Sequence, residues 1–401
     1  MNILLINHYA GHPKLGMEFR PFYIAREWVK QGHSVTILAA DYSHLRYCQP
    51  NGHGRRSEII DGIQYVWLPT IKYQGNGFAR LLNISQFLLS GCSYLRKKKG
   101  EYDHVIASST YPLDILLAKY VSKGSRVTFE LHDIWPMTLY TVGKLPRWHP
   151  FVMLMKVGER LSYWLSDKVV SMLSNAYDHV KLYGVKPENY CYIPNGVDSN
   201  AQFKFKDSLS DNATATLNAI TELKRNYDLV AGYVGGHAIS NHLDTLVATA
   251  EVSPEVAFVF VGSGNEKEKL KTSARNFKNV VFLDSIEKEE VAPVLKGMDI
   301  LLISWADEEI YKYGTGANKI FDYLLSGKPI IQAINSPNNP VQLAEAGLTV
   351  PPGDFQAIAK AVVTLKDKKL RDAMGQRGIQ YVNENHQYCE LSLRFIDFIN
   401  S

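Results

Sequence analysis

The stretch DILLISWADEEIYKYGTGANKIFDYLLSGKPIIQAI, residues 299–334, contains two short apolar runs on either side of a helical pattern. The runs DILLIS and PIIQAI are typical of buried strands. Between them, four apolar residues recur at the spacing of one helix face: Ile320, Phe321, Leu324 and Leu325. Gly327 ends this helix and Pro329 opens the second run. The stretch therefore predicts a βαβ unit with two parallel strands.

The same alternation of strand and helix patterns continues along the whole chain in two series. The first series contains the strand-like runs NILLIN, HSVTILAA, HVIASS, RVTFELHD and KVVSML, with a helix near residues 19–31. The second contains DLVAGYVGG, AFVFVGSG, NVVFLDS, DILLIS and PIIQAI. Two such series predict an α/β protein with two doubly wound, Rossmann-like sheets.

The segment YCYIPNGVDSN, residues 190–200, separates the two series, because its Pro, Asn and Gly are turn residues. We expect one domain over residues 1–192, a second over 193–380, and a C-terminal helix over 381–401 that packs back on the first domain. Ligands of doubly wound sheets bind at the carboxyl ends of the strands. We therefore expect the site in a cleft between the two domains.

The composition indicates a globular protein without a nucleic-acid or membrane-spanning signature. The chain of 401 residues is 46% hydrophobic and 21% charged, and its net charge of +4 is too small to indicate nucleic acid. Four scattered cysteines without a CxxC pair argue against zinc and disulfides and favour a reducing cytosol. The start MNILLIN lacks a basic region, and no apolar window reaches about eighteen residues. We expect neither a signal peptide nor a membrane span.

The start of the helix in the opening stretch carries residue types that bind an anion. Three small residues are expected to present backbone N–H groups where the helix dipole is positive: Thr315, Gly316 and Ala317. Lys319 adds a full charge, and Asn318, Lys319 and Asp322 would share one helix face. A nucleotide site would form if Lys319 bound a phosphate and Asp322 bound the ribose hydroxyls. The alternative is a weak i,i+3 ion pair between Lys319 and Asp322 on the surface.

Two glycine-containing turns follow strand-like runs of the second series. YVGGHAISNHLD places Gly235 and Gly236 between a strand and a helix, where bare N–H groups would suit a phosphate. A tight turn without a ligand explains this segment equally well. FVGSGNEKEKL, which includes Gly264, partly matches a dinucleotide fingerprint but lacks its third glycine. A nicotinamide or flavin enzyme is therefore disfavoured.

The motif HDIWP places His132 and Asp133 at the carboxyl end of the run RVTFEL. A neutral histidine there would contact a substrate hydroxyl, and Asp133 would orient it or bind sugar hydroxyls. The alternative is a histidine that only caps or packs at the end of a strand.

Together these motifs resemble family 4 of the retaining glycosyltransferases, which have the GT-B architecture of two facing Rossmann-like domains. The resemblance covers nearly the whole chain. It rests on Gly16-Met17-Glu18, AREWVKQGHSVTIL, ELHDIWP, IPNGVD, YVGG with LDTL, FVGSGNEKEKL and NKIFDYLLSGKPII. IPNGVD and FDYLLSGKPII are specific as a pair. GMEFRP and NKIFDY resemble bacterial O-antigen and capsule transferases in particular, including transferases of fucosamine (2-acetamido-2,6-dideoxy-L-galactose, FucNAc).

The resemblance implies a retaining enzyme that moves a sugar from a UDP-sugar on the second domain to an acceptor on the first. It implies a polyprenyl-diphosphate-linked saccharide as acceptor, and no metal or other cofactor. Asp322 matches the position of the family's ribose-binding acid, and His132 matches the position of the family's histidine near the transferred sugar. Glu18 and Asp133 would lie near the acceptor. Five further residues are expected to contact the donor: Gly16, Gly235, Gly236, Asn241 and Gly264.

The chain departs from the family pattern at this donor site. The first acid of the Glu-x7-Glu motif falls on Gly314, and the phosphate-binding Arg and Lys fall on Gly236 and Asn241. Lys319 stands where many members have Pro. Because a buried diphosphate requires a cation, we expect Lys319 and the helix start to supply the missing charge. The missing acid favours a deoxy or N-acetyl sugar as donor.

Two segments of the first domain, residues 77–100 and 145–165, combine apolar faces with aromatic and basic residues. They suggest peripheral contact with an anionic membrane, whereas ordinary core helices with solvated lysines are the alternative. We expect a cytoplasmic enzyme on the inner face of the cytoplasmic membrane. Two other functions stay open: a nucleotide-sugar epimerase on the same fold, and a non-catalytic nucleotide-sugar-binding partner.

Overall fold

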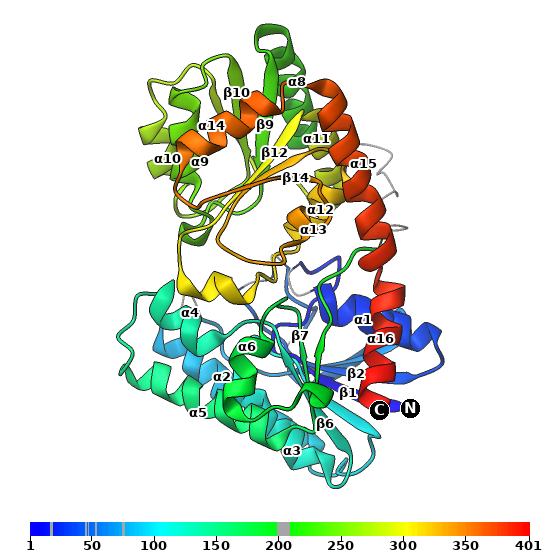
Figure 1. Cartoon of the computed structure of the whole chain (residues 1–401). Coiled ribbons are helices and arrows are strands. Elements are labelled where there is room, and N and C mark those ends of the chain that lie inside the picture. Colours follow the sequence, from blue (N-terminus) through cyan, green and yellow to red (C-terminus); the bar gives the residue numbers. More distant parts are fainter. Residues whose placement is uncertain (17–18, 45, 47, 53, 74–76, 199–208) are drawn as a thin grey trace. The chain divides into compact units, whose positions relative to one another are not determined.

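The computed structural model describes residues 1–401 except 17–18, 45, 47, 53, 74–76 and 199–208 (Figure 1). Its chain divides into two compact units. The first comprises Met1–Asn195 together with Tyr388–Ser401, and the second comprises Gly196–Gln387. The chain therefore enters the second unit once and returns to the first for its last helix. The limits expected from the sequence, after residues 192 and 380, differ from these boundaries, which follow residues 195 and 387.

The first unit is built on a sheet in which the structure describes eight strands, in the order β3-β4-β2-β1-β5-β6-β7-β8. Their bounds are β1 (Asn2–Ile6), β2 (Ser34–Ala40), β3 (Arg56–Ile60), β4 (Ile63–Leu68), β5 (His104–Ala107), β6 (Arg126–Leu131), β7 (Lys168–Ser171) and β8 (Tyr190–Tyr192). All neighbours are parallel except β3 and β4, which form an antiparallel hairpin at the edge. The turn residues Asp61 and Gly62 both have positive φ, as a two-residue hairpin turn requires.

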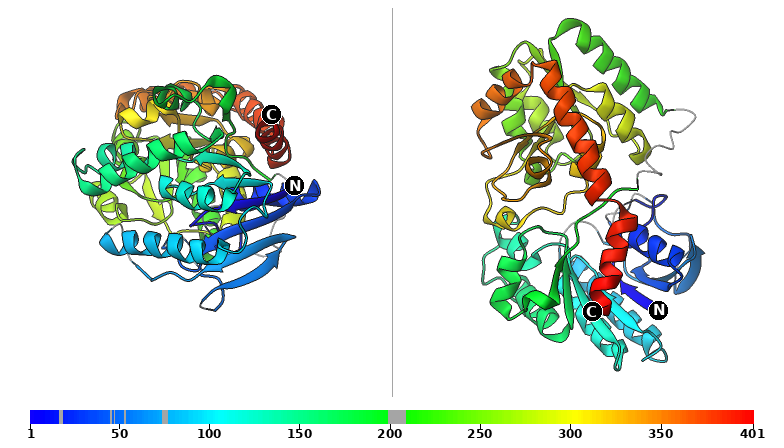
Figure 2. Two further views of the ribbon diagram at one scale, coloured as in Figure 1. Left: turned by 90° about the horizontal axis from the view of Figure 1, so that it is seen from below. Right: turned by 45° about the vertical axis from the view of Figure 1, so that its right-hand side comes forward.

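Helices cover both faces of this sheet. They are α1 (Phe19–Lys30), α2 (Phe78–Leu95), α3 (Ile115–Ser122), α4 (Trp135–Thr141), α5 (Pro150–Leu165), α6 (Tyr177–Val180) and α16 (Tyr388–Asn400), with short 3-10 turns η1 (Pro112–Asp114), η2 (Lys181–Tyr183) and η3 (Pro187–Asn189). On one face, α16 packs on α1, and Trp28 Nε1 donates to the carbonyl of Ser392 at 3.0 Å. Figure 2 shows α16, in red, running beside this unit. The other face carries α2, α3 and α5.

The second unit has a sheet in which six strands are described, in the order β11-β10-β9-β12-β13-β14, and all of its neighbours are parallel. The bounds are β9 (Leu229–Val234), β10 (Val256–Val261), β11 (Val280–Leu283), β12 (Ile300–Ser304), β13 (Ile330–Ala333) and β14 (Gly347–Val350). Val230 and Val234 of β9 belong to one core cluster, and Ala231 and Tyr233 belong to another. Successive side chains thus enter two separate cores, which is why the strands read as continuous apolar runs.

The helices of the second unit complete the doubly wound arrangement. They are α8 (Asp211–Asn226), α9 (Leu243–Glu251), α10 (Lys267–Ser273), α11 (Val291–Gly297), α12 (Lys319–Leu325), α13 (Pro340–Leu343), α14 (Phe355–Thr364) and α15 (Lys368–Asn385), with 3-10 turns η4 (Ile239–Asn241), η5 (Lys288–Glu290) and η6 (Glu309–Tyr313). Residues of α8, α11 and α12 share one core cluster, and residues of α9, α10 and α14 share the other. No described helix is both long and apolar enough to cross a membrane.

Candidate functional site

In the second unit, the candidate donor site is formed by the loops that follow β9, β10 and β12. The central residue is Lys319, the first residue of α12. Its Nζ donates to Tyr233 Oη at 2.6 Å and to Asn241 Oδ1 at 2.9 Å, and it lies 4.6 Å from the centroid of the Tyr233 ring. Both acceptor oxygens are neutral. Among the residues that the structure describes, Lys319 has no carboxylate partner.

Burial lowers the pKa of the Lys319 ammonium to about 8. A lysine that is partly removed from water and held only by neutral oxygens is costly as a cation. An anionic ligand beside Nζ would offset this cost. The arrangement thus agrees with a site for a phosphate group, and it places Asn241 against Lys319 rather than in open solvent.

The loops after β9 and β10 interlock through glycines. Gly235 N donates to Val261 O at 2.9 Å, and His237 N donates to Ser263 O at 2.8 Å. A Cβ atom on Gly262 would collide with the carbonyl of Gly235, and one on Gly264 would collide with the backbone of His237. Gly264 therefore permits the loops after β9 and β10 to approach each other. This packing explains why the segment FVGSG partly matches a dinucleotide fingerprint.

The interlocked loops change the expected roles of the two turn glycines. The N–H of Gly235 was expected to be bare, and this expectation is wrong, because it is bonded to the strand end of β10. The N–H of Gly236 has no acceptor among the described residues, and no atom lies within 4 Å of the position that its Cβ would occupy. Of the two turn glycines, only Gly236 presents an N–H without an acceptor among the described residues.

The loop before α12 also keeps donors available. The amides of Thr315, Ala317 and Asn318 donate no hydrogen bond to any other residue that the structure describes. The helix itself begins at Lys319. Gly316 lies in the same loop. Gly314 has φ +103° and ψ 179°, a conformation that is essentially restricted to glycine.

Asp322 does not interact with Lys319. Its carboxylate forms an ion pair with Lys288 of η5, and the Asp322 side chain is largely buried. The alternative of an i,i+3 pair on the surface is therefore wrong, and the two residues of one helix face contact different elements. Ribose binding by Asp322 stays a prediction. Lys288 was missed, since a lysine in the polar run IEKEE carries no distinguishing sequence signal.

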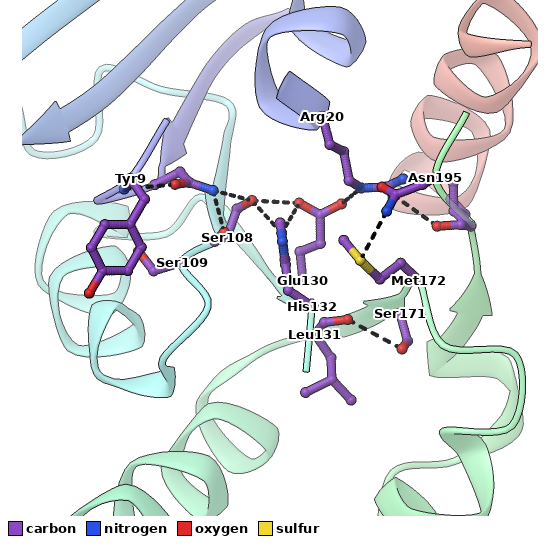
Figure 3. A network of polar contacts seen from close by, with 12 residues as sticks. Tyr9, Arg20, Ser108, Ser109, Glu130, Leu131, His132, Ser171, Met172 and Asn195 are labelled. Atoms are coloured by element: carbon purple, nitrogen blue, oxygen red, sulfur yellow. Dashed lines mark hydrogen bonds and ion pairs between the residues drawn. The ribbon is translucent and has the colours of Figure 1, made fainter. Parts of the chain in front are cut away.

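In the first unit, His132 lies in a buried polar network at the carboxyl end of β6 (Figure 3). Its Nε2 is 3.0 Å from Ser108 Oγ and 3.2 Å from Glu130 Oε2. Ser108 Oγ donates to the same Glu130 oxygen at 2.5 Å. Asn7 Nδ2 donates to the carbonyl of Ser108 at 2.6 Å. The imidazole thus contacts residues at the ends of β5 and β6, and Asn7 after β1 holds Ser108 in place.

The carboxylate of Glu130 in this network is paired with Arg20 of α1. Its Nε donates to Glu130 Oε1 at 2.9 Å, and its two NH groups donate to the carbonyls of Ile193 and Pro194. Burial alone would raise the pKa of Glu130, but the charge of Arg20 and the contact with His132 hold it well below its usual range. The sequence signal for this pair was an acid between two apolar residues near the end of the strand-like run RVTFEL, and it was missed.

Asp133 is held apart from this network. It accepts from Thr138 Oγ1 at 2.9 Å, and burial raises the pKa of its carboxyl to about 6. His132 and Asp133 both line a narrow pocket together with Trp135 and Glu159. Gly16 is a buried residue with φ +84°, whereas Glu18 lies outside the described residues.

No group of three or more metal-ligating side chains occurs in the described parts of the chain. The polar atoms of both candidate sites instead come from amides, hydroxyls, one lysine and single carboxylates. The site in the second unit can bind an anion, and the site in the first unit can hold a hydroxyl-bearing ligand beside an oriented imidazole.

Comparison with known proteins identifies the class of each unit. Residues 16–201 match the family model Glycosyltransferase Family 4, and residues 228–368 match the model Glycosyl transferases group 1. No curated protein sequence matches the chain. The chain therefore carries glycosyltransferase domains in both of its units.

Solved structures agree with this assignment at the level of the fold. The chain is similar to sucrose-phosphate synthase from Thermosynechococcus elongatus, with 16% identity, a TM-score of 0.75, and coverage of 100% of this chain and 98% of that one. It is similar to HepE of Anabaena in complex with UDP and glucose, with 15% identity, a TM-score of 0.67, and coverage of 100% and 99%. It is also similar to WaaG, a glycosyltransferase involved in lipopolysaccharide biosynthesis, with 14% identity, a TM-score of 0.66, and coverage of 100% and 99%. The fold is GT-B.

Proposed function

We propose that this protein transfers a sugar from a UDP-sugar to a lipid-linked saccharide. The observation that carries the proposal is Lys319, a half-buried cation that donates, among the described residues, to neutral oxygens only, in a glycosyltransferase domain. It lies where the loops of a doubly wound sheet hold their ligands. The diphosphate of a nucleotide sugar supplies the anion that this lysine requires. The structures of HepE with UDP and glucose, and with UDP-glucose, support the choice of nucleotide.

The proposed reaction is a substitution at the anomeric carbon of the donor sugar. The bond between this carbon and the diphosphate oxygen breaks, a bond to the acceptor hydroxyl oxygen forms, and UDP leaves with the negative charge. Lys319, the amide of Gly236 and the amides before α12 stabilise that charge as it develops. His132 and Asp133, at the strand end of the first unit, contact the sugar and the acceptor. Retention of configuration and independence from metals follow from the family resemblance.

We further propose an N-acetylated, 6-deoxy hexosamine such as FucNAc as the transferred sugar. The motifs GMEFRP and NKIFDY support it, and so does Gly314 in place of the acid that would lie beside the donor sugar. The acceptor is then a polyprenyl-diphosphate-linked saccharide of O-antigen or capsule biosynthesis, and the enzyme acts in the cytoplasm at the membrane.

A ligand panel on the purified protein tests the donor site. UDP, GDP, UDP-GlcNAc, UDP-GalNAc, UDP-FucNAc and NAD are each added to wild type, Lys319→Ala and the control Lys328→Ala, and the melting temperature is measured. Lys328 is a second half-buried lysine in the same unit. We expect UDP compounds to raise the melting temperature of wild type and the control but not of Lys319→Ala. A response to NAD alone, or an equal response in all three proteins, would contradict the proposal.

A turnover assay separates the transferase from the epimerase. Release of UDP that depends on an added lipid-linked saccharide supports transfer. UDP release or epimer formation without an acceptor would indicate the epimerase instead.

A further inference from the structure

The outer surface of α5 in the first unit is apolar, aromatic and basic at the same time. Along the helix, Met153, Val157 and Trp164 are exposed at the spacing of a single stripe. Trp148, just before the helix, and Trp164 near its end are each 77% exposed. Large apolar side chains grouped in this way on a water-soluble domain mark an interaction surface. We call residues 144–165 with these exposed side chains the α5 surface.

The charges of the α5 surface have one sign. Residues 144–165 contain four cations: Lys144, Arg147, Lys156 and Arg160. The single acid in this range, Glu159, is buried and contacts His179 Nε2 at 2.9 Å and Tyr163 Oη at 3.2 Å, so its charge faces inward. The outward charge is therefore wholly positive.

Neighbouring helices extend this surface. Gly91 of α2 lies against Leu117 of α3, and Gly158 of α5 lies against Leu113 beside α3, so the three helices form one layer on the sheet (Figure 1). α2 exposes Phe78, Leu82 and Leu89, its sequence contains no acid, and it is followed by the basic run RKKK. The outward faces of the layer thus share the same composition.

We propose that the α5 surface lies on an anionic lipid bilayer, with Trp148 and Trp164 at the level of the headgroups. Tryptophan and basic residues on one face of an amphipathic helix match the polarity and the charge of such an interface. A second copy of the chain fits poorly, because a two-fold contact would bring like charges together.

The α5 surface is also connected to the His132 pocket within the same unit. α4 starts at Trp135, two residues after Asp133, and the Trp135 ring packs on Phe151 of α5 with centroids 5.7 Å apart. A lipid-linked acceptor in the membrane would thereby have its saccharide close to the strand ends that carry His132. This last step rests on the proposed function, whereas the membrane contact itself does not.

Vesicle flotation of the full chain tests the surface. Vesicles of phosphatidylcholine alone and of phosphatidylcholine with about a third phosphatidylglycerol are compared at low and high salt. We expect binding only to the anionic vesicles and weakening with salt. At about 1 kcal/mol per cation, Arg147→Gln with Arg160→Gln should weaken binding roughly 30-fold. Trp148→Ser with Trp164→Ser should weaken it at least about tenfold.

Matched controls lie elsewhere on the chain. Arg225→Gln with Arg275→Gln removes two exposed cations from the second unit, and Ile59→Ser removes an exposed apolar residue from β3. These variants should bind vesicles as wild type does. Brominated lipids should quench the tryptophan fluorescence of wild type, and the Trp148→Ser, Trp164→Ser variant should lose this quenching while its melting temperature is unchanged.

Three results would overturn the assignment of this surface. The first is equal binding to neutral and anionic vesicles or to neither, and the second is unchanged binding by the two α5-surface variants. The third is a dimer of wild type, seen by light scattering, that the tryptophan variant converts to a monomer. UDP binding without vesicles is the independent readout of the proposed function. A protein that floats but ignores UDP refutes the function, and one that binds UDP but does not float refutes only the surface.

Discussion

Replacing Lys319 should weaken the binding of UDP without unfolding the protein. In the free protein its Nζ bonds to two neutral oxygens, Tyr233 Oη and Asn241 Oδ1, and among described residues it has no carboxylate partner. A bound diphosphate would accept a charge-assisted hydrogen bond from this cation, which is worth about 1.5–3 kcal/mol. Because the lysine is half-buried, we take about 2–3 kcal/mol for Lys319→Ala, which corresponds to a roughly 30- to 150-fold rise in the Kd for UDP.

The pH dependence of UDP binding tests the same reasoning. Burial lowers the pKa of Lys319 to about 8, and a bound diphosphate raises it again. Above pH 8 the free lysine is neutral and must take up a proton to bind, so the affinity should fall by up to about tenfold per pH unit. His237 titrates far below this range, since burial and nearby lysines lower its pKa to about 4. A phosphate group is already fully ionised there.

Calorimetry at pH 6.5 to 9.5 on wild type, Lys319→Ala and Lys319→Arg measures both effects. The arginine stays charged throughout, so its affinity should not decline with pH. The double variant Lys319→Asn with Asn241→Lys moves the cation back to the loop after β9 and should recover most of the lost affinity. If Lys319→Ala binds UDP within threefold of wild type, or if the arginine variant shows the same pH decline, the diphosphate is not held by this residue.

Five further substitutions test the electrostatics of the two units and the backbone strain at Gly314. Lys319→Met should raise the unliganded melting temperature at pH 7, and the gain should shrink between pH 8 and 10, because the wild-type lysine loses its buried charge there. Asp133→Asn should stabilise more at pH 8 than at pH 5 in urea titrations, because the raised pKa makes ionised Asp133 unfavourable above about 6. Arg20→Met and Glu130→Leu should each cost about 3–5 kcal/mol, with a double variant well below the sum; additive costs would mean that the pair is not coupled. Gly314→Glu should lower the melting temperature by straining a φ of +103°, at about 1–3 kcal/mol, without improving donor affinity in the ligand panel.

The sequence predicted the parts of the fold that depend on local patterns. The runs that became β1, β2, β5, β6, β7, β9, β10, β12 and β13 are largely buried, and a continuous apolar run is the pattern that a doubly wound sheet imposes. The run of β11 was also predicted, although this edge strand is only partly buried. The other three described edge strands, β3, β8 and β14, were missed. β3 is largely exposed, β8 has three residues, and β14 is only partly buried, so none shows such a run. The Asp61–Gly62 turn was the available signal for β3 and β4.

The sequence singled out the residues of the candidate site but not their contacts. Lys319 and Asp322 were expected on one helix face, and the helix spacing gave no indication that they would contact Tyr233 and Lys288 respectively. Those contacts depend on the order of β9, β12 and η5 in space, which local periodicity does not encode. The Arg20 and Glu130 pair was missed for the same reason, since 110 residues separate its members.

The proposed donor site also illustrates how a motif can be lost while the charge that it supplied is kept. In a parallel sheet the carboxyl ends of neighbouring strands lie at one edge, so a cation can come from the loop after β9 or from the loop after β12. Nζ of Lys319 lies 2.9 Å from Asn241, the position that carries a lysine in the family pattern, so one charge occupies nearly the same place from a different element. Electrostatic stabilisation depends on where the charge lies and not on which residue carries it. A comparison of motifs counts two missing phosphate ligands here, whereas the structure places a half-buried ammonium beside one of these two positions, Asn241.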